Sequence, residues 1–195
     1  MDENTITLNQ YNILGQKIDV DINKIRNNEK LEYVILKNFN VTNEIMVILE
    51  TLKNLKKIWF VNCNIIEKIK INNIDSIRIE NCENISNICY EQNINYLYIN
   101  NCKEFDVNTI VNLDLKGFEL EYTIPKNLQV LCKMKCLEIL SLKEIDLTKG
   151  HLNIPKSLKK IILNGSKVAN KEVVMNYFKE KNIQIEFLDK NLPIG

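Results

Sequence analysis

The chain contains one histidine, His151, and this scarcity removes several kinds of site. Zinc sites of the Cys/His type and histidine-dependent catalytic triads lack their usual members. With five glycines and no G-x-x-x-x-G-K-S/T or G-x-G-x-x-G motif, the chain offers no loop suited to cradling phosphate. We therefore expect a protein that is not an enzyme, with no cofactor, no metal and no small-molecule substrate. His151 follows Gly150 and is predicted to be an exposed turn residue.

The chain also lacks an excess of charge and any long apolar run. It has 26 Lys and Arg against 25 Asp and Glu, a formal net charge of +1, so no overall basic field draws it to nucleic acid. The acidic, polar start at Met1 does not resemble a signal peptide, and no window approaches 18 apolar residues. These features predict a soluble, intracellular, cytoplasmic protein with no membrane partner. Its six cysteines are then expected to be reduced thiols.

What the sequence does contain is a recurring segment of the form apolar-x-x-apolar-x-apolar-x-x-Cys. The cysteine closes each clear copy at the same offset, at positions 63, 82 and 102. The clear copies are Leu55, Ile58, Phe60, Cys63; Ile74, Ile77, Ile79, Cys82; and Ile94, Leu97, Ile99, Cys102. Alternation within each copy predicts a short strand with one inward face, and successive strands would stack into a parallel sheet.

The pattern extends in both directions with a different last residue. The second apolar position then recurs at 34, 58, 77, 97, 118, 140, 161 and 183. The added copies are Leu31, Val34, Leu36, Phe39; Leu115, Phe118, Leu120; Leu137, Leu140, Leu142, Ile145; Leu158, Ile161, Leu163, Ser166; and Ile183, Ile185. For the fifth copy, Ile110, Leu113, Leu115 and Phe118 match the template better by residue type but break the period. We favour the period.

These copies resemble the leucine-rich repeat family, whose consensus places Asn or Cys where Cys63, Cys82 and Cys102 stand. The resemblance covers residues 31–190, after a capping segment at 1–30 and before a tail at 191–195. No Pro/Gly/Ser-rich stretch divides the chain, so one folded unit is expected. The resemblance implies an α/β solenoid: a stack of about eight coils with a parallel front sheet. Ile-Pro elements in Thr123–Leu131 and Asn153–Leu163 resemble the FNIP subclass of that family.

The segments between the front strands predict two kinds of return. Thr42 precedes an acidic first turn and apolar spacing near 3.6 up to Leu55, which predicts a capped helix. Asn170 to Asn182 predicts a second helix by the same criteria. The middle returns are too short for helices and repeat the strand pattern, first at Ile66, Ile69 and Ile71 and then at Ile85, Ile88 and Tyr90. The solenoid is thus expected to have helical returns near both ends and extended returns in the middle.

The cysteines and the asparagines beside them have structural explanations. Cys132 and Cys136 form a C-x-x-x-C pair, which is too few ligands for zinc, and the other cysteines are expected to be small buried residues in the stack. The cysteine that closes each clear copy is immediately preceded by an asparagine, at Asn62, Asn81 and Asn101. They either hydrogen-bond along the stack or act only as soluble surface residues, and the sequence does not choose between these readings.

If the apolar positions point inward, the residue between the second and third of them points outward. Along the stack these residues are Ile35, Trp59, Arg78, Tyr98, Glu119, Ser141, Ile162 and Gln184. Flanking outward positions add Tyr33, Tyr96, Lys57, Val61 and Glu80. Trp, Tyr and Arg are enriched in interface hot spots, although chance also places some of them outward. The candidate partner-binding residues are therefore Tyr33, Ile35, Lys57, Trp59, Arg78, Glu80, Tyr96, Tyr98 and Glu119.

Three functions remain open from the sequence. The first is a protein-protein interaction module, an adaptor, inhibitor, scaffold or accessory subunit that binds a protein partner through the front sheet. The second is a component or regulator of a ribonucleoprotein assembly such as the ribosome, with Lys56, Lys57, Lys159 and Lys160 contacting phosphates. The third is an enzyme with an unrecognised site.

Overall fold

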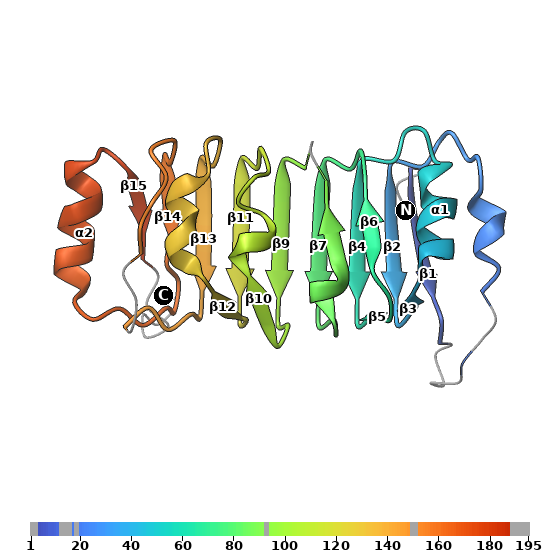
Figure 1. Cartoon of the computed structure of the whole chain (residues 1–195), viewed down its shortest axis with the longest axis horizontal. Helices are drawn as coiled ribbons and strands as arrows, with labels where there is room; N and C mark the ends of the chain where they lie inside the picture. The colour runs from blue at the N-terminus through green and yellow to red at the C-terminus, as the bar shows by residue number, and fades with distance from the viewer. Residues whose placement is uncertain (1–3, 12–16, 18–19, 92–93, 149–151, 188–195) are drawn as a thin grey trace, which may run out of the picture. The chain divides into compact units, whose positions relative to one another are not determined.

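The computed structural model describes residues 4–11, 17, 20–91, 94–148 and 152–187, in two compact units, Met1–Ile94 and Asn95–Gly195. The front strands of the first unit lie in the order β1-β2-β4-β7, and those of the second lie in the order β9-β11-β13-β14-β15. All the pairings between these front strands within each unit are parallel. Parallel strands with few helices are the arrangement expected of a solenoid-like stack (Figure 1).

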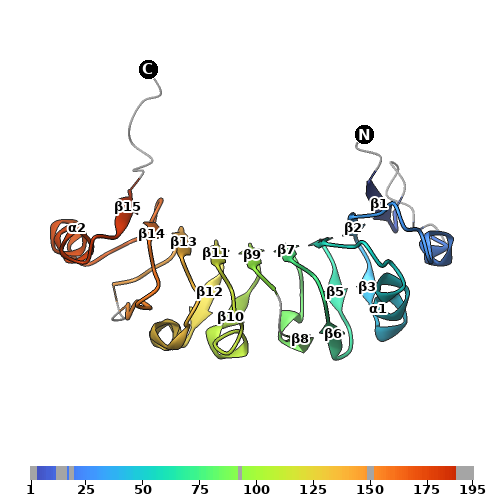
Figure 2. The ribbon, with the colours of Figure 1, turned by 90° about the horizontal axis from the view of Figure 1, so that it is seen from above.

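In the first unit, most of the remaining elements form a second layer on one side of the front strands (Figure 2). The front strands are β1 (Thr5–Asn9), β2 (Tyr33–Lys37), β4 (Lys57–Val61) and β7 (Ser76–Glu80). The other elements are η1 (Ile22–Ile25), β3 (Asn40–Val41), α1 (Asn43–Glu50), β5 (Asn64–Ile65), β6 (Ile69–Ile71), η2 (Ile85–Asn87) and β8 (Ile88–Tyr90). Strands β3 and β5 pair in parallel, as do β6 and β8, so the short returns build small sheets of their own.

The second unit repeats this plan. Its front strands are β9 (Tyr96–Asn100), β11 (Gly117–Glu121), β13 (Ile139–Lys143), β14 (Lys160–Ile162) and β15 (Gln184–Glu186). Its other elements are β10 (Glu104–Asp106), η3 (Val107–Thr109), β12 (Ile124–Lys126), η4 (Leu128–Lys133) and α2 (Lys171–Glu180). Strand β10 pairs in parallel with β12. Both predicted helices are present, and the two returns that contain β6 and β8 are extended as predicted, apart from the short turn η2. The prediction of extended middle returns is wrong for the later ones, which contain the 3-10 helices η3 and η4.

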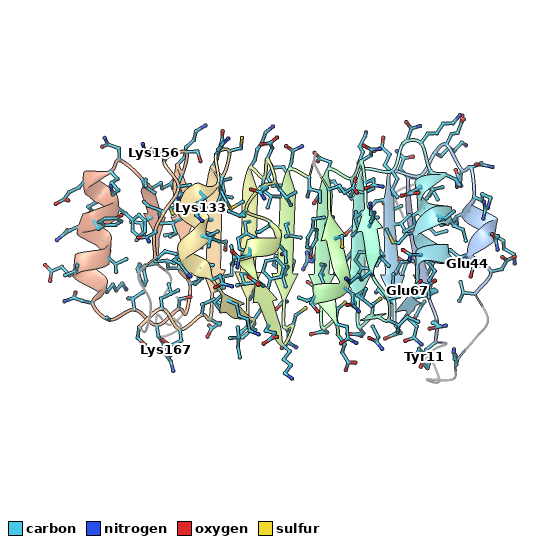
Figure 3. All side chains as sticks on the ribbon, in the orientation of Figure 1. Tyr11, Glu44, Glu67, Lys133, Lys156 and Lys167 are labelled. Atoms are coloured by element: carbon cyan, nitrogen blue, oxygen red, sulfur yellow. The ribbon has the colours of Figure 1, made fainter. Side chains whose placement is uncertain are left out.

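Helix α1 begins where its capping groups are. The Thr42 hydroxyl accepts a hydrogen bond from the Ile45 N–H at 3.5 Å, and Glu67 from the following return accepts one from the Asn43 N–H at 2.5 Å. Figure 3 shows Glu44 and Glu67 at this end of the helix. Two carboxylates at a helix N-terminus also offset the partial positive charge of its unpaired N–H groups. In α2 the Asn170 side chain accepts from the Val173 N–H at 3.1 Å.

The core is built from the inward side chains of the front strands. Val34, Ile58 and Ile77 are Cα partners in the first unit, and Leu97, Phe118 and Leu140 are Cα partners in the second. All six are no more than 2% exposed. The pairing of Phe118 with Leu97 and Leu140 confirms the register chosen for the fifth copy.

The register predicted for the last copy is wrong by two residues. Ile161 pairs with Ile185 rather than with Ile183, so Glu186 lies beside Ile162 while Gln184 lies beside Lys160. The cause is the end of α2, because the Ile183 N–H donates to the Phe178 carbonyl at 3.0 Å and Ile183 packs there, 8% exposed. The chain therefore enters β15 two residues later than the repeat spacing predicts.

The asparagines at the strand ends have a backbone role that the sequence analysis did not consider. Asn38, Asn62, Asn81 and Asn101 follow β2, β4, β7 and β9, and each has a positive φ, between 48° and 60°. Asn adopts this left-handed conformation more readily than most residues with a side chain. The Asn62 N–H donates to the Glu80 carbonyl at 2.9 Å, which continues the ladder of the sheet. The turn then carries the next residue, such as Cys63, into the core.

The buried residues that follow the strand-end turns are hydrogen-bonded from one coil to the next and so form a ladder. The Cys63 N–H donates to Cys82 Sγ at 3.3 Å, and the Cys102 N–H donates to Thr123 Oγ1 at 3.1 Å. The Ile145 N–H donates in the same way to a Ser166 hydroxyl 3.0 Å away. Hydrogen bonding with Cys82 lowers the pKa of the Cys63 thiol, although burial acts in the opposite direction. At this position a thiol sulfur and a hydroxyl oxygen therefore both accept a hydrogen bond from a backbone N–H of the preceding coil.

Cys63, Cys82 and Cys102 are buried, as predicted. Cys89 is not: it is exposed, because it lies in β8 of the second layer with its side chain on the solvent side. The prediction that every cysteine outside the Cys132–Cys136 pair would be a buried stack residue is therefore wrong for Cys89.

Tyr122 occupies the left-handed position after β11 with a φ of 47°, where four other strand ends have Asn. A residue with a Cβ is strained there by about 1–2 kcal/mol, and glycine is not. We expect Tyr122→Gly to be more stable than Tyr122→Ala by about 1 kcal/mol, or about 2–4 °C in Tm. Both variants lose the ring, so Tyr122→Ala is the matched control. Thermal unfolding followed by circular dichroism measures the difference, and equal Tm values would show that the backbone relaxes out of this conformation.

Candidate partner-binding surface

The outward side chains of the first unit form three rows across its front strands. The register places Thr7, Ile35, Trp59 and Arg78 in the central row. One flanking row contains Tyr33, Lys57 and Ser76, and the other contains Lys37, Val61 and Glu80. Neighbouring strands lie about 4.8 Å apart, so these side chains form one continuous surface, which we call the first-unit face.

The centre of the first-unit face is a stack of Arg78 on Trp59. The Arg78 guanidinium carbon lies 4.5 Å from the centroid of the Trp59 ring, within the range of a cation–π contact. Arg78 Nε also donates to Glu80 Oε1 at 2.7 Å. Since Trp59 and Arg78 are Cα partners and Glu80 follows Arg78 on the same face, the β4–β7 register alone brings the three together. The carboxylate and the ring hold Arg78 in one orientation.

Two aromatic side chains on this face, Tyr33 and Trp59, are partly buried although they point away from the core. Burial raises the pKa of Tyr33, which the positive charge of Arg78 opposes and the carboxylate of Glu80 reinforces. Trp59 Nε1 is buried and has no hydrogen-bond partner within the described part of the chain. An unpaired buried N–H costs about 1–3 kcal/mol. The tryptophan is therefore not the residue that folding stability alone would favour at this position.

The second unit has a front face of different chemistry. The Tyr96 ring packs over Gly117, where an added Cβ would lie 2.6 Å from a ring carbon. Tyr98 donates from its hydroxyl to Glu121 Oε2 at 3.0 Å, and Glu119 forms an ion pair with Lys143. Tyr98 and Glu119 are therefore each held by a residue of an adjacent strand.

The predicted site residues fall into these two faces. Tyr33, Ile35, Lys57, Trp59, Arg78 and Glu80 lie together on the first-unit face, and Tyr96, Tyr98 and Glu119 lie on that of the second unit. Ser141, predicted to point outward, does so but is only 3% exposed, because longer side chains at Glu119 and Ile162 flank it in the same row.

Three residues of these faces were not predicted from the sequence. Lys37 extends the first-unit face, and Glu121 and Lys143 hold Tyr98 and Glu119 in the second unit. A signal for all three was present, since each lies two positions beyond an outward residue already identified in the same strand. Strand β1 was also missed, although Ile6 and Leu8 show the same alternation.

The lysines assigned to phosphate contact are mostly paired with carboxylates. Lys56 lies 2.8 Å from Glu32, Lys159 lies 2.9 Å from Glu138, and Lys160 lies 2.6 Å from Glu186. Each pair joins adjacent coils and reduces the charge available to a polyanion. Among the described residues, Lys57 alone of the four has no ion pair.

The remaining sequence-based candidates contribute no site. Cys132 donates to the Gln129 carbonyl and Cys136 to Asp114, so the two thiols bond to different neighbours. No group of three or more His, Cys, Asp or Glu is placed to hold a metal ion in the described ranges. The turn predicted at His151 lies outside them. No described helix has the length and apolar character needed to cross a bilayer.

No protein-family model matches the chain, and no curated protein matches it at the significance required.

Proposed function

We propose that this protein is a non-enzymatic protein-protein interaction module, an adaptor, inhibitor or accessory subunit that binds a protein partner through its front strands. The observation that carries the proposal is the Trp59–Arg78–Glu80 stack. It places the only tryptophan on the outward face, fixes an arginine over it, and leaves the indole N–H without a hydrogen-bond partner among the described residues. Trp and Arg are typical binding hot spots, and an unpaired buried N–H reduces folding stability.

The architecture that we propose for this function is a leucine-rich-repeat-like solenoid of about eight coils. The inward apolar ladder, the parallel registers within each unit and the left-handed residues at successive strand ends support it. A solenoid presents one row of outward residues per coil, so a partner would contact several coils at once. The ribonucleoprotein alternative is less favoured, because three of its four lysines are already in ion pairs.

Co-purification from the native organism tests the proposal. We expect the wild-type chain to recover a protein partner that Trp59→Ala and Arg78→Ala lose. Tyr98→Ala tests whether the second unit contributes. Ile162→Ala is the matched control, since Ile162 also points outward but lies outside the proposed site. Recovery of the same partners by every variant would contradict the proposal, and steeply salt-dependent recovery of RNA would favour the alternative.

A further inference from the structure

We propose that the first-unit face binds an acidic segment of the partner in extended conformation, with an apolar residue between two carboxylates. This inference rests on the proposed function and specifies the chemistry of the partner at the same surface.

The first step is the charge of the face. Its outward residues include three cations, Lys37, Lys57 and Arg78, and one carboxylate, Glu80. Glu80 is bonded to Arg78 and compensates it. Within the described part of the chain, no ion pair involves Lys37 or Lys57, whereas Lys53, Lys56 and Lys70 of the same unit all have carboxylate partners. The face is therefore cationic at two positions that no described carboxylate neutralises.

The second step is the spacing of those two lysines. Lys57 is the Cα partner of Tyr33, and Lys37 lies four residues after Tyr33 on β2. The two lysines therefore lie about 13 Å apart along the strand direction. Carboxylates four residues apart on an extended peptide have the same separation, since each residue advances the chain by about 3.3 Å.

The third step is what lies between the lysines. Ile35 and Trp59 are Cα partners at the midpoint, with Tyr33 on one side and Val61 on the other. An apolar side chain midway between two acidic residues would contact Ile35 and the exposed part of Trp59. The acidic residues would then reach Lys37 and Lys57. The complementary pattern is acidic-x-apolar-x-acidic.

A nucleic-acid strand fits this surface less well. Its phosphates follow one another at closer intervals than the two lysines, and the intervening surface of Ile35 and Val61 offers them no charge. The paired Arg78 and Glu80 on β7 would also offer no net positive charge to a polyanion that continued past β4. A peptide with isolated carboxylates and an apolar centre avoids both problems.

The experiment is selection from a displayed library of random peptides on the wild-type chain. We expect enriched clones to carry the acidic-x-apolar-x-acidic pattern. Their capture should fall about tenfold on the Lys37→Glu/Lys57→Glu variant, since two attractive charge pairs become repulsive. Lys30→Glu/Lys68→Glu is the charge-matched control, because both lysines are exposed and lie outside the front strands, and it should leave capture unchanged. Circular dichroism verifies that all variants fold.

A charge exchange completes the test. Enriched clones remade with lysine at both acidic positions should prefer the Lys37→Glu/Lys57→Glu variant over the wild type. Failure to enrich the pattern, capture that survives the double reversal, or displacement of the clones by a short thymidine oligonucleotide at equal concentration would overturn the inference. If the inference fails while Trp59→Ala still loses the native partner, the proposed function stands with a partner of different chemistry. If acidic clones bind but Trp59→Ala retains the native partner, the proposed function fails instead.

Discussion

A chain carrying Trp59→Ala is expected to bind its protein partner at least about thirtyfold more weakly than the wild type, while keeping its fold. Truncation of a tryptophan hot spot costs about 2 kcal/mol or more in binding. Here it also removes the ring on which Arg78 rests, so the guanidinium loses one of the two contacts that orient it. The measurement is calorimetric titration of each variant with the partner recovered by co-purification.

The change in stability from the same substitution should be small, about 1 kcal/mol, because Trp59 is only partly buried and its N–H is unpaired. Trp59→Phe is the more demanding control. It keeps an aromatic surface for Arg78 and removes the unpaired N–H, so its stability should equal or exceed that of the wild type. Its affinity should lie between those of the wild type and Trp59→Ala. An affinity for Trp59→Ala equal to that of the wild type would remove Trp59 from the site.

Phe60→Ala is expected to lower the stability strongly while leaving the affinity for the partner close to that of the wild type. Phe60 is adjacent to Trp59 in β4 but points inward, where it is fully buried. Replacing a buried Phe by Ala costs about 3–5 kcal/mol, the sum of lost burial and the cavity left behind. For a chain of this length the expected fall in Tm is about 6–20 °C. Urea unfolding at constant temperature gives the free energy directly.

The pair of variants separates folding from binding within one strand. At temperatures where it remains folded, Phe60→Ala should bind the partner with close to wild-type affinity, because the outward residues of β4 are unchanged. Val61→Ala serves as the stability control, since Val61 points outward and its truncation should cost little. A small loss of stability for Phe60→Ala would contradict the assignment of the inward face, and with it the outward assignment of Trp59.

The sequence predicted the inward and outward faces well because side-chain alternation in a strand is a local property. Once Ile58 and Phe60 are identified as inward, Lys57, Trp59 and Val61 must point the other way. The caps at Thr42 and Asn170 were predictable for the same reason, since the residues that they cap lie within the next three positions. The site residues of each face follow from these local rules.

The contacts that give the site its chemistry were not predictable in the same way. Tyr98 bonds to Glu121, which is 23 residues further along the chain, and Glu119 pairs with Lys143. The sequence contains many Lys and Glu residues, and only the register of adjacent strands decides which of them meet. For the same reason the sequence could not show that Lys37 and Lys57 form no ion pair with any described residue, since that depends on the position of every nearby carboxylate.

The sequence by itself thus determined the strand faces, the helix caps and the buried ladder position, because each depends on residues a few positions apart. The tertiary structure decided the register at Ile185, the left-handed strand ends such as Asn62, and the stack of Arg78 on Trp59. These depend on the length of each return, which sets the residues that become neighbours across strands. Repeat spacing gives the length of a return only on average. Before β15, the end of α2 makes the return two residues longer than that spacing predicts.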